Sequence, residues 1–335
     1  MSLLSKSNSK ITKFDRSRPA RIHPFQRAAS SVAIAAVLSA CMNAPAERVS
    51  PAPKAGTRPV EHALGVANVP KTAERVAVLG PSALDATLAL GVKPIASSAE
   101  GEFPDYLGDL LDGITAIGTP GQPNLEKILK LQPDLILGTK VSDETIYSHL
   151  SRIAPTVLTE DTGRDGKWVE NFRLYAEALG QGDRGDRLLE DYRQKVKAVQ
   201  KQIGEPGEIV VSVVFSSQGY IGFYSDTSFS GSVLADLELS RPTIQTQPET
   251  APYLSIVSKE AFSDLDGDAI FLIVGLESEQ LSLEEFINDP LFSQLSAVKK
   301  GRVYPVRWEV WQAGRSLLAA HQILQDVAGA LTEQE

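Results

Sequence analysis

The sequence is short of the residues that bind metal ions or form cross-links. Its 335 residues include one cysteine, four histidines and two methionines. A single cysteine excludes an intramolecular disulfide and a cluster of thiolate ligands. The few histidines and methionines offer little to metals that prefer imidazole or thioether ligands. We therefore expect no directly bound metal ion and no resident cofactor.

Acidic residues outnumber basic residues in this chain. The chain has 33 lysines and arginines against 42 acidic residues, a net charge of −9 and a pI of about 5.1. This is the wrong sign for proteins that bind a phosphate backbone, so nucleic acid is excluded as a partner class. The 42% content of hydrophobic residues is typical of a folded chain. The length corresponds to about two domains.

The N-terminal region lacks a membrane-spanning run but has the order of an export signal. Seven basic residues and one acid precede a run of small and apolar residues at 28–38. This run is too short to cross the ~30 Å hydrocarbon core of a bilayer, which needs about 20 helical residues. The only cysteine, Cys41, follows Leu-Ser-Ala and so resembles the lipobox of bacterial lipoproteins. The resemblance implies cleavage before Cys41 and its lipidation; the alternative is a terminal helix with a chance cysteine.

We expect residues 1–40 to be a lipoprotein signal peptide and residues 41–70 to be a flexible tether rich in alanine and proline. Removing 1–40 takes seven bases and one acid from the 33 and 42 of the whole chain, which leaves a net charge of −15. Anionic headgroups repel such a chain, so acyl chains rather than a basic patch would anchor it. The predicted location is periplasmic or otherwise extracytoplasmic, on a membrane.

Short β-rich runs alternate with helical patterns on both sides of one long helical region. This alternation is typical of doubly wound α/β lobes. The long region predicts a helix over Asp183–Ile203, about 31 Å in length. The fold class is therefore α/β, with two doubly wound lobes joined by one long connecting helix. We expect an N-terminal lobe at 71–165, a helical connection at 166–204 and a C-terminal lobe at 205–335.

Each half of the chain has an acid at the expected start of a helix. Glu126 and Glu260 both stand eight residues before an aspartate that precedes a strand, and two residues after a helix-capping type, Asn124 or Ser258. The plain interpretation is that an acid in a first helical turn is stabilised by the helix dipole, by ~0.3–1 kcal/mol. The functional interpretation is that each lobe presents one carboxylate to a two-sided partner.

Three segments resemble the substrate-binding proteins of ABC-type importers of iron siderophores. They are RVAVLGPSALDATLALGVKPIAS at 75–97, IGTPGQPNLEKILKLQPDLILG at 117–138 and LFSQLSAVKKGRVYPVRWEVWQAGRSLLAAHQILQD at 291–326. The family includes ferric citrate, ferric hydroxamate and cobalamin binders, and the resemblance covers about residues 70–333. It implies a bilobal protein whose Glu126 and Glu260 dock into arginine pockets of an ABC permease dimer served by ATPase subunits. We expect a monomer.

The resemblance also implies a ligand between the lobes, on loops at the ends of the sheets, where open α/β sheets commonly bind ligands. The segment 307–315 is chemically the richest, because guanidiniums offer charge-assisted hydrogen bonds and indoles offer flat apolar walls. Packing in the core or on the surface is the alternative for each of these side chains, and Tyr253 is a further candidate. The expected ligand-binding residues are Arg307, Trp308, Trp311, Arg315, Ser82, Thr119, Gln122, Tyr224 and Arg241.

The predicted function is capture of a ferric siderophore and its delivery to the permease, without catalysis. The chain has no Gly-x-Ser-x-Gly elbow, Walker loop or His-Glu-x-x-His motif. Three alternatives stay open: a haem or cobalamin binder of the same fold, a siderophore esterase, and a structural surface lipoprotein. An absorbance shift with haem would indicate the first, and hydrolysis of a ferric triester chelate the second. The third predicts no thermal shift with any ferric chelate.

Overall fold

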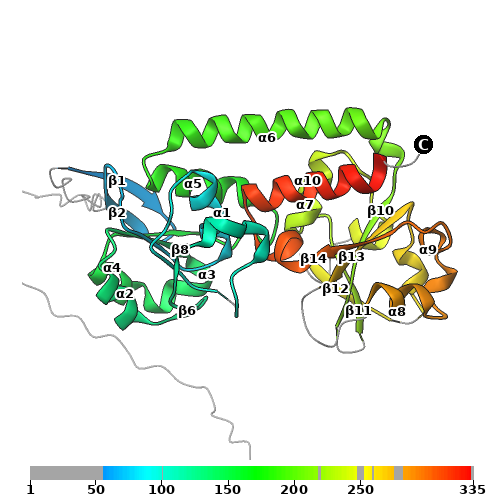
Figure 1. Ribbon diagram of the computed structural model, residues 1–335, viewed down its shortest axis with the longest axis horizontal. Helices are drawn as coiled ribbons and strands as arrows, with labels where there is room; N and C mark the ends of the chain where they lie inside the picture. Colours follow the sequence, from blue (N-terminus) through cyan, green and yellow to red (C-terminus); the bar gives the residue numbers. More distant parts are fainter. Residues whose placement is uncertain are drawn as a thin grey trace, which may run out of the picture. The chain divides into compact units, whose positions relative to one another are not determined.

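The computed structural model describes residues 56–99, 101–217, 220–246, 253–258, 260–274 and 282–332. The predicted signal peptide, Cys41 and the first part of the predicted tether lie outside the described residues. The described chain forms two α/β lobes, and two helices run along one side of both (Figure 1). No helix among the described residues has the length and apolar character needed to span a membrane.

The N-terminal lobe has a five-stranded parallel sheet in the order β5-β4-β3-β8-β9. The order runs outward from β3 in both directions, as in a doubly wound sheet. The apolar runs of β3 and β8 are buried on both faces, which is why they read as continuous hydrophobic segments. The strands are β3 (Val76–Val78), β4 (Ala96–Ser97), β5 (Thr115–Ala116), β8 (Leu135–Thr139) and β9 (Thr156–Thr159).

Helices cover both faces of this sheet. One face packs against α1 and α5, and the other against α2 and α4. A short hairpin, β6–β7, and a 3₁₀ helix, η1, lie in the loops between strands. The bounds are η1 (Asp105–Leu111), α1 (Pro81–Ala89), α2 (Leu125–Leu131), α3 (Lys140–Asp143), η2 (Glu144–Ile146), α4 (Tyr147–Ile153), α5 (Trp168–Ala178), β6 (Gly118–Thr119) and β7 (Gln122–Pro123).

The C-terminal lobe has a mixed sheet in the order β12-β11-β10-β13-β14. Strands β10, β13 and β14 are parallel, whereas β11 and β12 are antiparallel to their neighbours. The tight connection from β10 to β11 is too short for a crossover, so these two strands must be antiparallel. The elements are η3 (Pro206–Glu208), β10 (Val211–Ser217), β11 (Tyr220–Tyr224), α7 (Phe229–Asp236), η4 (Thr243–Thr246), β12 (Leu254–Val257), η5 (Phe262–Leu265), β13 (Ala269–Val274), α8 (Leu283–Asn288), η6 (Phe292–Gln294), α9 (Ser296–Lys299) and β14 (Val303–Arg307).

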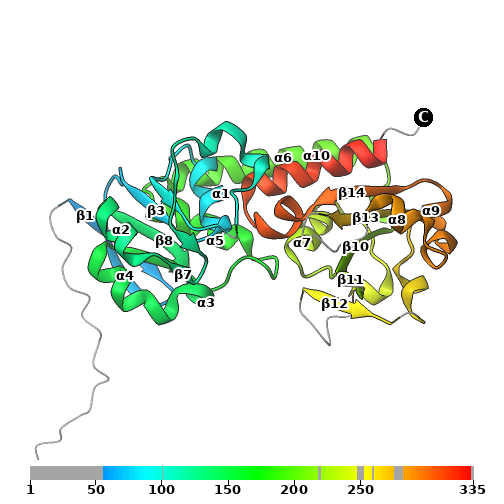
Figure 2. The same ribbon diagram turned by 60° about the horizontal axis from the view of Figure 1, so that its bottom comes forward.

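Two helices join the lobes. The predicted long helix is confirmed as α6 (Gly182–Ile203), which ends at Gly204 with φ of 94°. The last helix, α10 (Leu317–Thr332), packs against α6 and against α1 and α7, so it touches both lobes (Figures 1 and 2). It is preceded by a turn of π-helix, η7 (Glu309–Ala313).

The predicted tether is wrong for residues 57–70. They form an antiparallel hairpin of β1 (Thr57–His62) and β2 (Gly65–Pro70) that packs on the N-terminal lobe. Val60 and Val69 are fully buried, and the backbone N–H of Ala63 donates to the carbonyl of Leu158 at 3.0 Å. The composition resembled a tether because the hairpin buries only a few small side chains.

The repeated acid-to-aspartate pattern has a structural basis in its second member. Asp134 accepts hydrogen bonds from the backbone N–H groups of Glu74 and Arg75, and Asp268 accepts one from Val210. Each aspartate thus ties the start of its own strand to the start of the neighbouring parallel strand. The expected helix start at Ser258 is wrong: a 3₁₀ helix, η5, begins at Phe262 without a side-chain cap, whereas Asn124 does cap α2.

Candidate functional site

The loop from residue 160 to residue 167 brings the N-terminal lobe into contact with the C-terminal lobe. It follows β9, and the carbonyl of Arg164 accepts a hydrogen bond from the N–H of Phe229, the first residue of α7, at 3.1 Å. Figure 2 shows this loop reaching toward α7. Gly163, at φ of 74°, lies so close that an added Cβ would stand 3.2 Å from the carbonyl oxygen of Arg315. Glycine is therefore needed for the approach.

The side chain of Arg164 binds a tyrosine of the other lobe. Its Nη1 donates to the hydroxyl of Tyr253 at 3.1 Å, and the guanidinium carbon lies 5.0 Å from the centre of the ring. This distance allows a cation–π interaction. The backbone carbonyl of Tyr253 accepts a hydrogen bond from Ser225 at 3.0 Å, which holds the tyrosine on the C-terminal lobe.

Tyr224, Trp308 and Arg315 complete this group from the C-terminal lobe. Burial raises the pKa of Tyr224, while a hydrogen bond from Trp308 and the charges of Arg315 and Arg164 act in the opposite direction. These effects require the side chains to lie close together. We call the five residues the inter-lobe cluster: Arg164, Tyr224, Tyr253, Trp308 and Arg315.

The backbone of Arg315 is in an unusual conformation. Its φ is 47°, in the left-handed region that side-chain-bearing residues rarely adopt. The Nε of Arg315 donates to the carbonyl of Gln312 at 2.5 Å, and the Nε2 of Gln312 donates to the hydroxyl of Ser230 at 2.6 Å. The π-helical turn η7 is thus fixed to α7, and it presents Arg315 at the edge of the cluster.

Three predicted ligand residues of the C-terminal lobe lie outside the cluster. Trp311 is fully buried, stacks near Phe271 and donates its indole N–H to Asp326 at 2.8 Å, as a core residue does. Arg307 is exposed and lies 3.5 Å from Glu309 in an ion pair. Burial lowers the pKa of Arg241 to about 10, and its Nη2 donates to the backbone carbonyl of Tyr224. Arg241 therefore supports Tyr224 from within the lobe.

The predicted ligand residues of the N-terminal lobe also lie outside the cluster. Ser82 is buried at the start of α1, where it bonds to Tyr175. Thr119 and Gln122 are exposed and face each other across the β6–β7 hairpin. Asp143 holds this hairpin through hydrogen bonds from Gly121 and Thr139, and burial raises the pKa of Asp143 to about 6.

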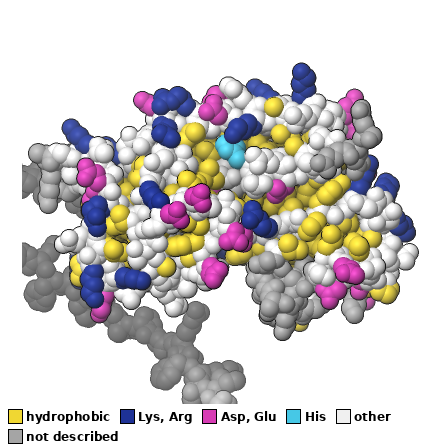
Figure 3. All heavy atoms as spheres, viewed as in Figure 1, with side chains coloured by type: hydrophobic (Ala, Val, Ile, Leu, Met, Phe, Trp, Pro, Cys, Tyr) yellow, Lys and Arg dark blue, Asp and Glu magenta, His cyan; other side chains and the backbone are white. Residues whose placement is uncertain are grey.

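The two expected docking acids are exposed, one on each lobe. Glu126 lies in the first turn of α2, and Glu260 precedes η5. In the space-filling view, acidic and basic side chains lie side by side where the lobes meet, next to a strip of hydrophobic side chains of the C-terminal lobe (Figure 3). The described residues contain no group of three or more side chains suited to hold a metal ion.

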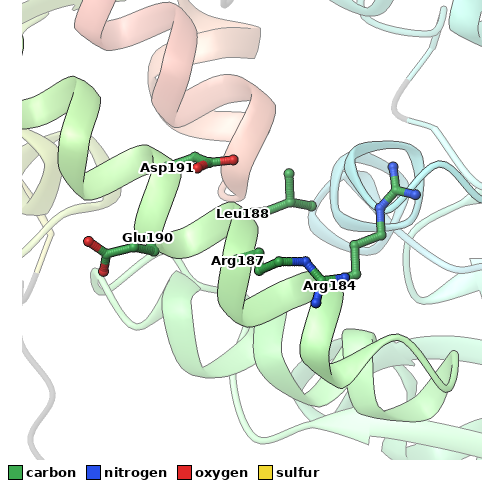
Figure 4. A pocket seen from close by; sticks show the side chains of 5 residues that line it. All are labelled: Arg184, Arg187, Leu188, Glu190 and Asp191. Carbon is green, nitrogen blue, oxygen red and sulfur yellow. The ribbon is translucent and has the colours of Figure 1, made fainter.

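Two surface cavities follow α6, away from the cluster residues. One, of about 410 Å³, is lined by Arg184, Arg187, Leu188, Glu190 and Asp191 (Figure 4). The guanidinium of Arg184 lies over Gly91, at the carboxyl end of α1, where a positive charge is favourable. The second, of about 330 Å³, contains Tyr192 and Asp236, which bond to each other at 2.8 Å. The contacts of Arg184 and of Tyr192 with Asp236 therefore serve the packing of α6 on its neighbouring helices.

Sequence analysis missed Arg164. It lies in a loop without hydrophobic periodicity, and its partner Tyr253 is 89 residues away. The available signal was the arginine between two glycines, Gly163 and Gly166, directly after a strand of the parallel sheet.

Comparisons with known proteins agree with this architecture. The chain is 34% identical over 303 residues to the probable siderophore-binding lipoprotein YfiY of Bacillus subtilis (strain 168), covering 87% of this chain and 93% of that protein. It is 29% identical over 265 residues to the achromobactin-binding periplasmic protein of Dickeya dadantii (strain 3937), covering 76% and 85%. The crystal structure of Staphylococcus aureus SirA with staphyloferrin B superimposes with a TM-score of 0.71 at 27% identity, covering 82% and 98%.

These matches confirm the resemblance and the bilobal α/β fold expected from the sequence. A family model described as periplasmic binding protein matches residues 76–307, which include both sheets and three of the five cluster residues, Arg164, Tyr224 and Tyr253. On this match and on the identity to YfiY, the chain belongs to the periplasmic binding protein family.

Proposed function

We propose that the chain is the substrate-binding lipoprotein of an ABC importer and captures a ferric siderophore between its lobes without changing it chemically. The inter-lobe cluster is the observation that carries this proposal. It combines two guanidiniums, Arg164 and Arg315, with the aromatic side chains of Tyr224, Tyr253 and Trp308. An anionic chelate with apolar arms needs both charge-assisted hydrogen bonds and flat apolar surfaces.

The chemistry of the cluster favours chelated over bare iron. Two guanidiniums repel a free cation, and burial raises the pKa of Tyr224, which disfavours the phenolate that would ligate Fe³⁺. A ferric chelate with a net negative charge is instead attracted by the two guanidiniums. Relatives named for siderophores, and SirA with staphyloferrin B, support this class of ligand.

The two connecting helices determine how the lobes move. Both α6 and α10 pack against elements of the two lobes, and a single buried core cluster includes residues of both. Stiff helical connections favour small twisting over wide hinge opening. The ligand is therefore enclosed by a modest closure around the cluster.

Membership in the periplasmic binding protein family places the chain outside the cytoplasm. Lipidation of Cys41 would hold it on a membrane, and Glu126 and Glu260 would present it, as a monomer, to a permease dimer with ATPase subunits. The two carboxylates stand on different lobes, which supports recognition by a two-sided partner.

Tryptophan fluorescence tests the proposal directly. Trp308 belongs to the cluster, whereas Trp168 and Trp311 are core residues with at most 1% exposure. We expect quenching by at least one chelate in a panel of ferric staphyloferrin B, ferric achromobactin and ferric citrate. Trp308→Phe should remove most of the quenching, and Trp311→Phe should not.

The same panel contains the competing outcomes. Binding of haem or cobalamin but of no ferric chelate would replace the proposed ligand, and release of hydrolysed chelate would indicate an esterase. Absence of quenching and of any thermal shift with all of these ligands would overturn the proposal.

A further inference from the structure

A carboxylate of the N-terminal lobe caps the helix that follows Arg315. Asp85, on α1, accepts hydrogen bonds from the backbone N–H groups of Leu318 and Ala319, both at 2.9 Å. These residues belong to the first turn of α10, whose N–H groups have no partner within the helix. The sequence separation is more than 230 residues, so the contact depends entirely on how the lobes are joined.

Arg315 lies between two anchored pieces of chain. On one side, η7 is fixed to the C-terminal lobe by the bond from Gln312 to Ser230. On the other side, two residues after Arg315, α10 begins and is held by Asp85 of the N-terminal lobe. A residue at φ of 47° keeps that conformation only when its surroundings enforce it. The two anchors therefore flank Arg315 in the chain, one on each lobe.

The geometry points to Asp85 as a positioning residue for the ligand site: by capping α10 from α1, it fixes Arg315 and ties the two halves of the site together. This inference rests on the proposed function. Asp85 also lies four residues after Pro81, in the first turns that follow the loop at 80–82. It therefore connects α1 of the N-terminal lobe with the segment that follows Arg315.

The surroundings of Asp85 hold few charges. The 3₁₀ helix η1 supplies Tyr106, whose hydroxyl donates to Asp85 at 2.8 Å. Arg307, the last residue of β14, and Glu309 act on the pKa of Tyr106 in opposite directions. The first turn of α10 contains no acidic residue, and α5 turns Tyr175 and other uncharged side chains inward.

Burial raises the pKa of Asp85 to about 6, although the bonds from Leu318, Tyr106 and Ala319 oppose this. The ionised carboxylate can accept from both backbone N–H groups, whereas the protonated acid loses one acceptor position. Acidification through pH 6 should therefore loosen the start of α10 and weaken binding.

Asp85→Asn tests the inference, because asparagine keeps the shape but removes one acceptor. We expect an affinity about tenfold lower at pH 7.5 for whichever ferric chelate of the panel binds the unmodified protein, and a weaker pH dependence between 5 and 7.5. The matched control is Asp236→Asn, which removes a carboxylate that also bonds to a tyrosine at 2.8 Å but does not cap α10. Asp143→Asn measures the titration of the other acid with a pKa of about 6.

A double-mutant cycle with Arg315→Ala tests whether Asp85 affects the affinity through Arg315. If Asp85 acts through Arg315, Asp85→Asn should lower the affinity much less in the Arg315→Ala background. Equal losses in both backgrounds, or an unchanged affinity and pH profile in Asp85→Asn, would overturn the inference. If Asp85→Asn folds poorly, Tyr106→Phe tests the same group: it removes a hydrogen bond that opposes the rise in the pKa of Asp85, so the affinity of this variant should begin to fall at a higher pH.

Hydrogen exchange separates this inference from the proposed function. The amides of Leu318 and Ala319 should exchange faster in Asp85→Asn than in the unmodified protein without any ligand present. Failure of the unmodified protein to bind any chelate would defeat the proposed function alone. Unchanged exchange at both amides would defeat the role of Asp85.

Discussion

Arg164 of the N-terminal lobe binds Tyr253 of the C-terminal lobe twice, by a 3.1 Å hydrogen bond to the hydroxyl and by placing its guanidinium 5.0 Å from the ring centre. The pair makes the site a property of both lobes, because the two side chains come from different lobes.

Arg315→Ala should weaken binding of an anionic ferric chelate by about ten- to a hundredfold, because it removes a charge-assisted hydrogen bond of ~1.5–3 kcal/mol. Arg307→Ala should have a smaller effect, since Arg307 is exposed and already paired with Glu309. Fluorescence titration measures both. Arg193→Ala, which breaks an exposed pair with Glu190 on α6, is the control and should bind normally. Equal affinities for all three variants would contradict the site.

Gly163→Ala should lower both stability and affinity. An alanine at φ of 74° costs roughly 1 kcal/mol, and its Cβ would stand 3.2 Å from the carbonyl of Arg315. Gly113→Ala is the matched control, because Gly113 has φ of 76° and nothing within 4 Å of an added Cβ. Thermal unfolding should show a loss of stability from backbone strain in both variants. Chelate titration should show a loss of affinity in Gly163→Ala only. Similar affinities would mean that the loop at 160–167 does not shape the site.

The double variant Glu126→Ala with Glu260→Ala should leave chelate affinity intact and abolish uptake. Both carboxylates are exposed, so their removal leaves the inter-lobe cluster unchanged. Uptake of ⁵⁵Fe-labelled chelate by cells and titration of the purified protein give the two readings. The control removes Glu190 and Glu205, two other exposed acids. Normal uptake by the first variant would show that the docking assignment is wrong.

His321 should make the fold less stable in acid. Burial lowers the pKa of His321 to about 4, with Lys195 acting in the same direction and Asp191 against it. Between pH 4 and about 6.5 the unfolded chain binds the proton and the folded chain does not, so the free energy of unfolding falls as the pH falls. Asp85 and Asp143, with raised pKa values, contribute the opposite slope.

The prediction is therefore a difference between variants. His321→Gln should show a smaller loss of unfolding free energy between pH 7 and 5 than the unmodified protein, measured by urea unfolding at each pH. His149→Gln, at an exposed position of α4, should retain the loss. Parallel curves for His321→Gln and the unmodified protein would contradict the buried, neutral state of His321.

Local patterns were enough to predict much of the fold. The helix from Asp183 was readable because its apolar residues recur at helical spacing over six turns, and α6 begins within one residue of that position. The apolar runs of β3, β8 and β13 were readable because strands buried on both faces are continuous in sequence. The hairpin of β1 and β2 was missed, since its burial depends on β9 rather than on its own composition.

Local patterns were not enough to predict the site. Trp308 and Trp311 are three residues apart, and the sequence predicted both as ligand-binding residues. In the structure, Trp308 belongs to the cluster, whereas Trp311 packs on Phe271. Trp308 precedes the π-helical turn η7 and Trp311 lies within it, and nothing in the local pattern indicated that turn.

The sequence by itself determined the lobes, the long connecting helix and the class of protein, because these follow from repeating patterns between near neighbours. Only the tertiary structure decided which arginines and aromatic side chains meet, and that Asp85 caps α10. The physical reason is distance along the chain: the hydrogen bonds from Arg164 to Tyr253 and from Ala319 to Asp85 form only after both sheets have formed and the last helix has packed across them.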